Sequence, residues 1–294
     1  FLQHGVTAFK QCHKTYRKNC GNQMALFVVT SEPEQKIIEK YFGYDKEEVI
    51  VTGFSRWDVL EDRSDPAHKE ILLMPTWRNW LEDISEEAFR KSEYYQRYET
   101  LLQDERLRTI LERENITLNF YIHAKFRERL GNFYTEDRHI RLIPFGTVPL
   151  NQLLMSCHML ITDYSSVSWD VYYQEKPVVF YPFDLETYEK VQGSYMDYKK
   201  DVFGDLAWDQ NQLVDLIGVV GQQAQGLGPQ VPEDLKLRLN GGLIDGNLLG
   251  KVSIHLVIAG KNAAGGGVHI GFDKANVRTP VQVFLVVRPP KHVV

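Results

Sequence analysis

Short apolar runs alternate with amphipathic segments along residues 1–220. The apolar runs ALFVV, EILLM, ITLNFYI, IRLI, MLIT and PVVFY have the length and composition of buried strands. Between them, the segments EPEQKIIEKYF, YYQRYETLLQDERLRTILERE and NQLLMS space their apolar residues at helical intervals. Because strands that alternate with helices usually pair in parallel, the pattern predicts an α/β fold with a parallel sheet flanked by helices. The carboxyl ends of such strands lie on one edge, where ligands bind.

The pattern changes near residue 221. Residues 221–250 are rich in Gly, Gln and Pro and show little periodicity, which predicts a linker or loop region. The runs KVSIHLVIAG, GGVHIGFD and VQVFLVVRPP follow, with Gly-rich turns and no helical segment between them. We therefore predict one domain over residues 1–220 and a small β-rich unit over residues 251–294.

Composition and charge exclude several classes of function and kinds of site. A chain of 294 residues with 43% hydrophobic residues can bury a full core, and a net charge of -5 argues against a general nucleic-acid binder. The three cysteines, Cys12, Cys20 and Cys157, contain no C-x-x-C pair, so neither a disulfide framework nor a zinc site is indicated. A reducing compartment is the simplest interpretation. No apolar run has the length of a membrane-spanning helix.

Polar or ionisable residues stand where three of the predicted strands stop, in the stretches PTWR, YIH and TDYSS. Ser165 and Ser166 come at the predicted start of a helix, where free backbone N–H groups and the helix dipole favour an anion. This arrangement predicts a phosphate site. A simpler alternative stays open, in which Asp163 and Ser165 only cap the helix.

Two histidines add candidate chemistry. His4 lies at a predicted turn with Lys10 nearby, and His123 ends a strand. A single histidine is more often structural than catalytic, but two at such positions, with Arg56 and Arg78, favour a reaction site. A histidine can take the proton of an attacking hydroxyl, while arginine and a second histidine can neutralise a diphosphate.

The motifs together resemble a known family. His-Gly with a following Lys, TGFSRWD, PTWR, YIHAK, TDYSSVSWDVYYQEKPVVFY and FDLETY are similar to motifs of the CDP-glycerol glycerophosphotransferase family, which includes teichoic acid and capsule polymerases and primases. The resemblance covers residues 1–205. It implies a GT-B-type fold of two Rossmann-like halves, of which this chain would hold the nucleotide-donor-binding half. Residues 1–20 would be the end of an acceptor half; because the chain begins with Phe1, we expect a fragment whose acceptor half lies upstream.

The resemblance also implies residue roles. His4 corresponds to the general base for the acceptor hydroxyl and His123 to the histidine at the donor diphosphate, so both are predicted to be catalytic. The predicted donor site consists of Arg56, Arg78, Thr162, Ser165, Ser166 and Asp170. Tyr188 matches the family's tyrosine after FD, where ordinary packing is the alternative. Departures, such as His123-Ala124 in place of His-Pro, leave the charged groups intact but leave the polyol and acceptor open.

The implied activity is transfer of glycerol phosphate, or a related polyol phosphate, from a CDP-linked donor to a hydroxyl of a cell-surface polymer or glycan, with release of CMP. We expect no metal, no cofactor and no nucleic-acid partner. The enzyme would be cytoplasmic, at the inner face of the cell membrane, with any membrane contact made by the missing part. Two alternatives stay open: a GT-B glycosyltransferase that uses a nucleotide sugar, and a non-catalytic nucleotide-binding module.

Overall fold

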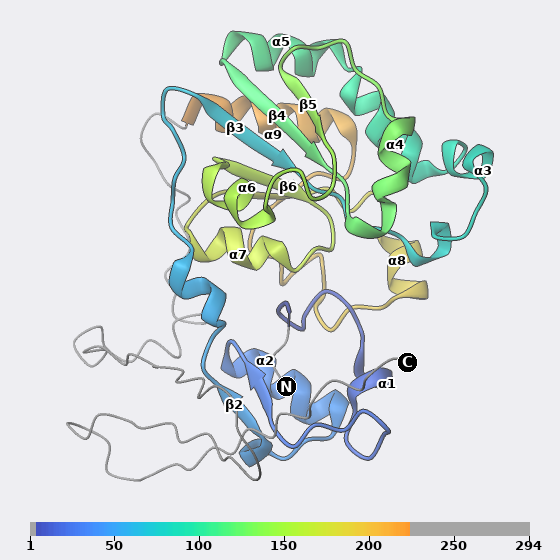
Figure 1. The fold of residues 1–294 in the computed structure, drawn as a ribbon, viewed down its shortest axis with the longest axis vertical. Helices are drawn as coiled ribbons and strands as arrows, with labels where there is room; N and C mark the ends of the chain where they lie inside the picture. The colour runs from blue at the N-terminus through green and yellow to red at the C-terminus, as the bar shows by residue number, and fades with distance from the viewer. Residues whose placement is uncertain (1–3, 224–294) are drawn as a thin grey trace, which may run out of the picture. The chain divides into compact units, whose positions relative to one another are not determined.

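The computed structural model of the chain describes residues 4–223 (Figure 1). All of these residues belong to one compact unit. The predicted β-rich unit, and the predicted linker beyond residue 223, lie outside the described residues and stay predictions. The last described helix, α9 (Gln210–Gln223), continues three residues past the predicted domain end at 220.

A six-stranded sheet with strand order β5-β4-β3-β6-β7-β8 organises the larger part of the described chain, and every pairing in it is parallel. The strands are β3 (Lys69–Leu73), β4 (Ile116–Tyr121), β5 (Ile140–Ile143), β6 (Met159–Thr162), β7 (Val178–Phe180) and β8 (Asp205–Leu206). All six residues of β4 are buried, as expected for a strand covered on both faces. The predicted α/β fold with a parallel sheet is therefore confirmed.

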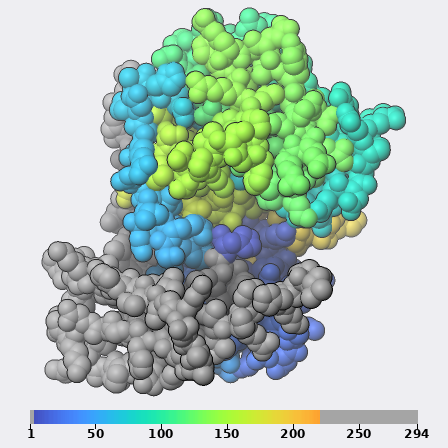
Figure 2. All heavy atoms as spheres, in the orientation of Figure 1, coloured from blue at the N-terminus to red at the C-terminus, as the bar shows by residue number. Residues whose placement is uncertain are grey.

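Helices cover the sheet, and side chains fill the space between the ribbons (Figures 1 and 2). Besides α9, they are α3 (Glu86–Arg90), α4 (Glu93–Leu102), α5 (Glu105–Arg113), α6 (Leu150–Ser156), α7 (Val167–Tyr173) and α8 (Leu185–Val191), with 3₁₀ turns at Asn79–Leu81 and Ala124–Asn132. The long predicted helical segment is two helices, α4 and α5. The helical segment is interrupted at Asp104. The side chain of Asp104 caps α5 by accepting hydrogen bonds from the backbone N–H groups of Arg106 and Leu107 at 2.8 and 3.0 Å.

The core has one layer on each side of the sheet. Leu73 and Ile71 belong to a cluster with Leu107, Leu111 and Ile217, while the intervening Leu72 belongs to a cluster with Leu154, Val171 and Phe180. This alternation follows from the period-two geometry of a strand. The two clusters hold the carboxyl ends of β3, β4 and β6 in fixed positions.

Within residues 4–60, a second and smaller set of strands and helices packs together. Strands β1 (Phe27–Val29) and β2 (Val49–Val51) pair in parallel and pack on α1 (His13–Tyr16), α2 (Glu32–Ile37) and a π-helical turn at Ile38–Phe42. Short 3₁₀ turns at Lys46–Glu48 and Ser55–Val59 precede and follow β2. Phe27, Val29, Ile38, Phe42, Tyr44 and Val49 make a hydrophobic cluster of their own. Ser31 caps α2 and Pro33 lies in its first turn, where the fixed φ of proline suits a helix start.

Candidate functional site

The ends of three central strands meet at one edge of the sheet, as the sequence predicted. Strands β4, β3 and β6 are neighbours in that order. After β3, the backbone N–H of Thr76 donates to the Asp163 carboxylate at 2.8 Å, which joins the segments after β3 and β6. The rings of Trp77 and His123 lie 6.0 Å apart, centroid to centroid, which joins the segments after β3 and β4.

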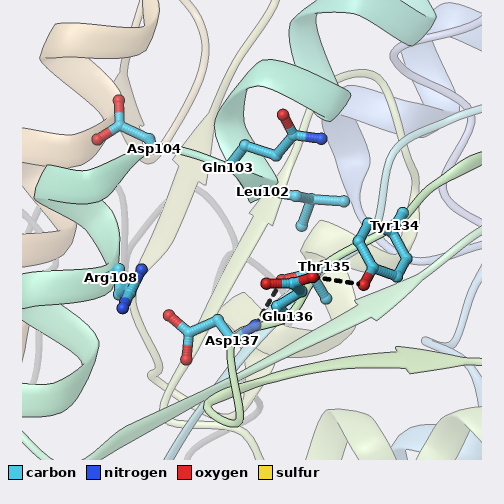
Figure 3. Close-up of a pocket in the computed structure, with 8 residues that line it drawn as sticks. All are labelled: Leu102, Gln103, Asp104, Arg108, Tyr134, Thr135, Glu136 and Asp137. Carbon is cyan, nitrogen blue, oxygen red and sulfur yellow. Dashed lines mark hydrogen bonds between the residues drawn. The ribbon is translucent and has the colours of Figure 1, made fainter.

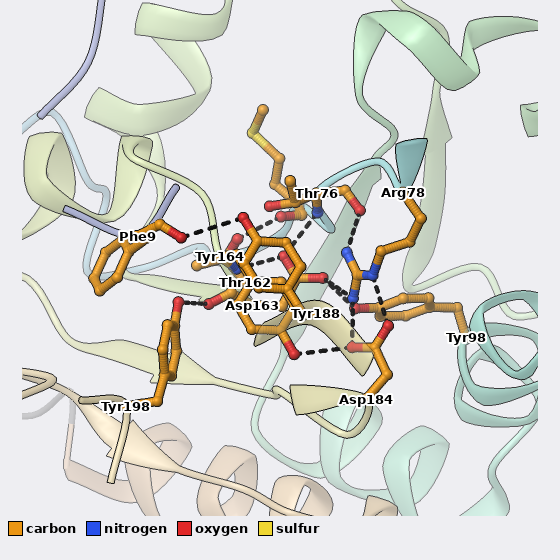
Figure 4. A network of polar contacts seen from close by, with 11 residues as sticks. Phe9, Thr76, Arg78, Tyr98, Thr162, Asp163, Tyr164, Asp184, Tyr188 and Tyr198 are labelled. Carbon is orange, nitrogen blue, oxygen red and sulfur yellow. Dashed lines mark hydrogen bonds and ion pairs between the residues drawn. The ribbon is translucent and has the colours of Figure 1, made fainter. Parts of the chain in front are cut away.

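Arg78 lies on the inner side of this edge and is completely buried (Figure 4). Its guanidinium donates to both oxygens of Asp184 at 2.7 and 2.9 Å and to the carbonyl of Thr76 at 2.6 Å, and it pairs with Asp163 at 2.9 Å. Burial opposes the charge, but the carboxylates of Asp163 and Asp184 outweigh it and hold the pKa of Arg78 well above its usual value. Four contacts within the protein thus hold the guanidinium of Arg78, a residue that was predicted to bind the nucleotide donor.

Tyrosines surround the same network. Tyr164 donates from its hydroxyl to Asp184 at 2.9 Å and stacks on Tyr188, with ring centroids 3.6 Å apart. Tyr188 donates to the carbonyl of Phe9 at 3.2 Å, so it has a packing role. The network holds two carboxylates and one guanidinium, so the tyrosine hydroxyl and backbone N–H donors compensate the remaining negative charge. The sequence analysis missed Asp184 as a site residue; its only signal was its place in the FDLETY motif.

The corner formed by residues 162–170 has a buried start and a more exposed middle. Thr162 is buried and donates to the carbonyl of Met74 at 2.6 Å. Ser165 and Ser166 are half-buried; the Ser165 hydroxyl accepts from the N–H of Val167 at 3.4 Å, and Ser166 makes no capping hydrogen bond through its side chain. The capping alternative therefore holds only weakly, and only for Ser165. Because α7 has seven residues, its dipole is short, so any anion here would depend mainly on the hydroxyls.

Asp170 ends the corner and pairs with Arg56. Arg56 donates through Nε and Nη2 to the two Asp170 oxygens at 2.9 and 3.2 Å, and Trp57 donates through Nε1 at 2.5 Å. The Asp170 side chain is 5% exposed and that of Arg56 is 35% exposed. Burial raises the pKa of Asp170 against the opposing effect of Arg56 and Trp57. Trp57 was not predicted, although it is adjacent to Arg56 in the sequence.

His4 is exposed and is followed by Gly5, which lies directly against the corner. A Cβ atom placed on Gly5 would come within 2.2 Å of the Ser166 hydroxyl oxygen, so only glycine permits this approach. The structure thus brings the His-Gly turn and the serine pair together. These two motifs are more than 150 residues apart in the sequence.

His123 is half-buried beside Trp77. Its Nδ1 atom accepts a hydrogen bond from the backbone N–H of Lys125 at 3.2 Å. Since Nδ1 is an acceptor, the proton of the neutral ring is on Nε2, which can donate to a ligand. Burial, followed by the charge of Lys10, lowers the pKa of His123 to about 4, so the ring is neutral near pH 7.

The described part of the chain also contains two pockets, the second of which adjoins the corner through Trp169. Figure 3 shows one of about 290 Å³, lined by residues 102–104, Arg108 and residues 134–137, which contains none of the predicted site residues. A second pocket of about 300 Å³ lies between Thr7, Glu34, Trp169 and Phe203. Among residues 4–223, no group of three or more His, Cys, Asp or Glu side chains is placed to hold a metal ion. Within the same residues, none of the helices has the length and apolar character needed to span a membrane.

Comparison with known proteins gives a clear family match. Residues 2–227 match the model of the family described as CDP-Glycerol:Poly(glycerophosphate) glycerophosphotransferase. The minor teichoic acid biosynthesis protein GgaB of Bacillus subtilis (strain 168) is 31% identical over 227 residues, which cover 74% of this chain and 24% of GgaB. A teichoic acid glycerol-phosphate transferase of Staphylococcus aureus (strain NCTC 8325 / PS 47) is 25% identical over 215 residues, covering 67% of this chain and 52% of that protein.

A solved structure of the wall teichoic acid polymerase TagF has the same fold. The TM-score is 0.58 at 18% sequence identity, over 81% of this chain and 62% of that one. This likeness confirms the predicted Rossmann-like, GT-B-type α/β fold. The chain spans about a quarter to a half of the length of the two curated relatives. Because the family model covers more than half of its residues, the chain belongs to the CDP-glycerol:poly(glycerophosphate) glycerophosphotransferase family.

Proposed function

We propose that the protein transfers glycerol phosphate, or a related polyol phosphate, from a CDP-linked donor to a hydroxyl of a cell-surface polymer or glycan in teichoic acid or capsule synthesis. The observation that carries this proposal is the contact between the His-Gly turn and the serine corner. Gly5, the residue after the candidate base His4, lies against Ser166, a candidate hydroxyl donor for a phosphate, in a chain of this family. Two relatives are named for teichoic acid synthesis, which supports the polymer class.

The chemistry follows from the exposed side of the site. The hydroxyls of Ser165 and Ser166 and the Nε2–H of His123 would donate to the donor diphosphate. His4 would accept the proton of the acceptor hydroxyl as its oxygen forms a bond to the phosphorus of the polyol phosphate. The bond from that phosphorus to the bridging oxygen breaks in the same displacement, and CMP leaves with the electron pair.

The other residues predicted to bind the CDP-linked donor would have different roles, some structural and some in contact with the ligand. Arg78 and Thr162 are buried and paired, so we assign them to holding the corner in place. Arg56 is partly exposed and could reach a bound nucleotide, while Asp170 would orient it through their ion pair. We also propose that the enzyme works in the cytoplasm at the inner face of the membrane. The three free cysteines are consistent with such a reducing compartment.

A donor screen tests the proposed function. The full-length protein would be incubated with CDP-glycerol, CDP-ribitol or a UDP-sugar and a polyol-phosphate acceptor, and the products analysed by mass spectrometry. We expect CMP and an acceptor heavier by one polyol phosphate. Transfer of a sugar with release of UDP would instead support the glycosyltransferase alternative. Nucleotide binding without consumption of any donor would support the binding module.

A further inference from the structure

Two lysines from distant parts of the chain meet at Trp77. The Lys10 ammonium lies 4.9 Å from the centre of the Trp77 ring, and the Lys125 ammonium lies 5.6 Å from it. The His123 ring lies 6.0 Å from the same ring. Lys10 follows the His-Gly turn, Trp77 follows β3, and Lys125 follows β4, so three segments bring two cations and a histidine to one place.

The charges in this cluster are not balanced. Lys125 pairs with Glu82 at 2.5 Å, whereas no carboxylate in the described range 4–223 lies at ion-pair distance from Lys10. Partial burial lowers the pKa of Lys10; Cys12 and Glu82 oppose this effect, and Lys125 adds to it. The Lys10 residue is exposed, and its ammonium lies over an indole face beside a second cation, so an anion that binds there is attracted by both charges. The cluster therefore favours a negatively charged ligand.

His123 contributes a hydrogen bond and no charge. Because its Nδ1 accepts from the N–H of Lys125, its ring directs a donor, Nε2–H, to whatever binds there. A neutral donor next to two ammonium groups suits the oxygens of a phosphate, which accept hydrogen bonds and carry negative charge. The two functions are divided between residues: the lysines supply the charge and the histidine supplies the direction.

We propose that Lys10, Lys125 and the Nε2–H of His123 form a phosphate-binding subsite against Trp77. The identity of the phosphate rests on the proposed function: it would be the diphosphate of the CDP-linked donor or a phosphodiester of the acceptor polymer. Both have the same chemistry at this subsite. Lys10 is the determining residue because its charge lacks a carboxylate partner in the described residues, and because it connects the His-Gly turn to the end of β4.

Binding measurements on the complete 294-residue chain test this subsite. Isothermal titration calorimetry would compare wild type, Lys10→Met and Lys10→Arg with three probes: CDP-glycerol, inorganic pyrophosphate and a short poly(glycerol phosphate). Lys14→Met is the matched control, because Lys14 is an exposed lysine of α1 that is not part of the cluster. We expect Lys10→Met to weaken binding about tenfold, Lys10→Arg to restore most of it, and Lys14→Met to have little effect. The difference should shrink at high salt.

Each outcome separates the subsite from the proposed function. Weaker binding of CDP-glycerol and pyrophosphate identifies the donor diphosphate, and weaker binding of the polymer alone identifies the acceptor phosphodiester. If wild type binds CDP-glycerol but Lys10→Met and Lys14→Met bind all probes equally well, the subsite is wrong and the proposed function stands. If Lys10→Met weakens pyrophosphate binding while wild type neither prefers nor consumes CDP-glycerol, the subsite stands and the proposed function is wrong. A wild type that binds none of the probes overturns the subsite.

Discussion

The corner of residues 162–170 has an inner side, Thr162 and Asp163, and an outer side, Ser165 and Ser166. The polar groups of the two sides differ in their hydrogen bonding. On the inner side, Thr162 and Asp163 are fully buried and bonded to the segment after β3. On the outer side, Ser165 and Ser166 are half-buried, and their side chains make one long hydrogen bond or no capping bond at all. Four neighbouring residues of one motif are therefore divided between holding the structure and offering groups to a ligand.

The two arginines show the same contrast. Arg78 is 0% exposed and is held by two carboxylates and a carbonyl, whereas Arg56 is 35% exposed and is held by Asp170. Both occur in motifs that resemble family motifs, so the motifs alone did not distinguish them. Burial and the number of partners distinguish the two arginines. Arg78 is fully buried and bonded within the protein, whereas the partly exposed guanidinium of Arg56 is accessible to a ligand.

The largest expected effect on activity is that of a substitution at His4, which precedes the glycine that lies against Ser166 on the outer side of the corner. In the full-length enzyme, His4→Ala should lower turnover by roughly 10² to 10⁴, the usual range for loss of a general base. Donor affinity and melting temperature should change little, because His4 is exposed and is not assigned to the donor. Steady-state kinetics, donor titration and thermal melting on the same preparation measure all three. A lower melting temperature together with lost donor binding would make His4 a structural residue.

On the inner side, Arg78→Met should reduce the free energy of unfolding by about 3–5 kcal/mol. The variant leaves the carboxylates of Asp163 and Asp184 buried without their cation, and an uncompensated buried charge costs about that much. Urea denaturation of the full chain measures the change.

Arg56→Met is the matched control for Arg78→Met and should cost about 1 kcal/mol, because its side chain is partly exposed. Asp170 keeps its hydrogen bond from Trp57, and burial already raises its pKa, which makes its neutral form more accessible. Equal losses of stability in the two variants would remove the distinction between the inner and outer arginines.

A smaller effect is expected at the serine pair. Ser165→Ala should weaken CDP-glycerol binding by about 1–3 kcal/mol, the scale of a lost hydrogen bond to a charged group. Thr162→Val is the inner-side control: it removes the bond to Met74 and should lower stability without a specific loss of affinity. Calorimetric titration and melting of both variants test this. If Thr162→Val alone lost affinity, at normal stability, the ligand would bind at the inner side of the corner and the prediction for Ser165 would be wrong.

The sequence predicted the parallel α/β architecture because the strands are short apolar runs and the helices have helical spacing. It also predicted that PTWR, YIH and TDYSS would meet, since parallel strands place their carboxyl ends together. It did not predict the burial of Arg78, because that depends on Asp184, which is 106 residues away and is brought close by packing. The lowered pKa of His123 was equally hidden, because it depends on burial and on the charge of Lys10, which is distant in the sequence. The break between α4 and α5 was readable in principle from Asp104, a strong capping residue.

The most specific effect concerns the protonation of His123. Its pKa is lowered from 6.5 to about 4, by burial and then by Lys10 and Lys125, against the opposing charges of Asp163 and Glu82. Between pH 6.5 and about pH 4 the unfolded chain therefore binds a proton at this ring that the folded chain does not bind. Stability from His123 is present above pH 6.5, falls as the pH drops through this range, and changes no further below about pH 4.

NMR titration of ¹³C-labelled histidine in the full chain should show one ring with a midpoint near pH 4, assigned by its absence from His123→Gln. The Lys10→Met variant should move that midpoint upward, because a cation next to the ring is removed. Added pyrophosphate should also move it upward in wild type if the anion binds beside the ring, and less so in Lys10→Met. A midpoint near 6.5 in wild type would mean that the ring is solvated and free of both lysines. His123 would then belong with His4 as an exposed residue, and its hydrogen bond from the N–H of Lys125 would not hold in solution.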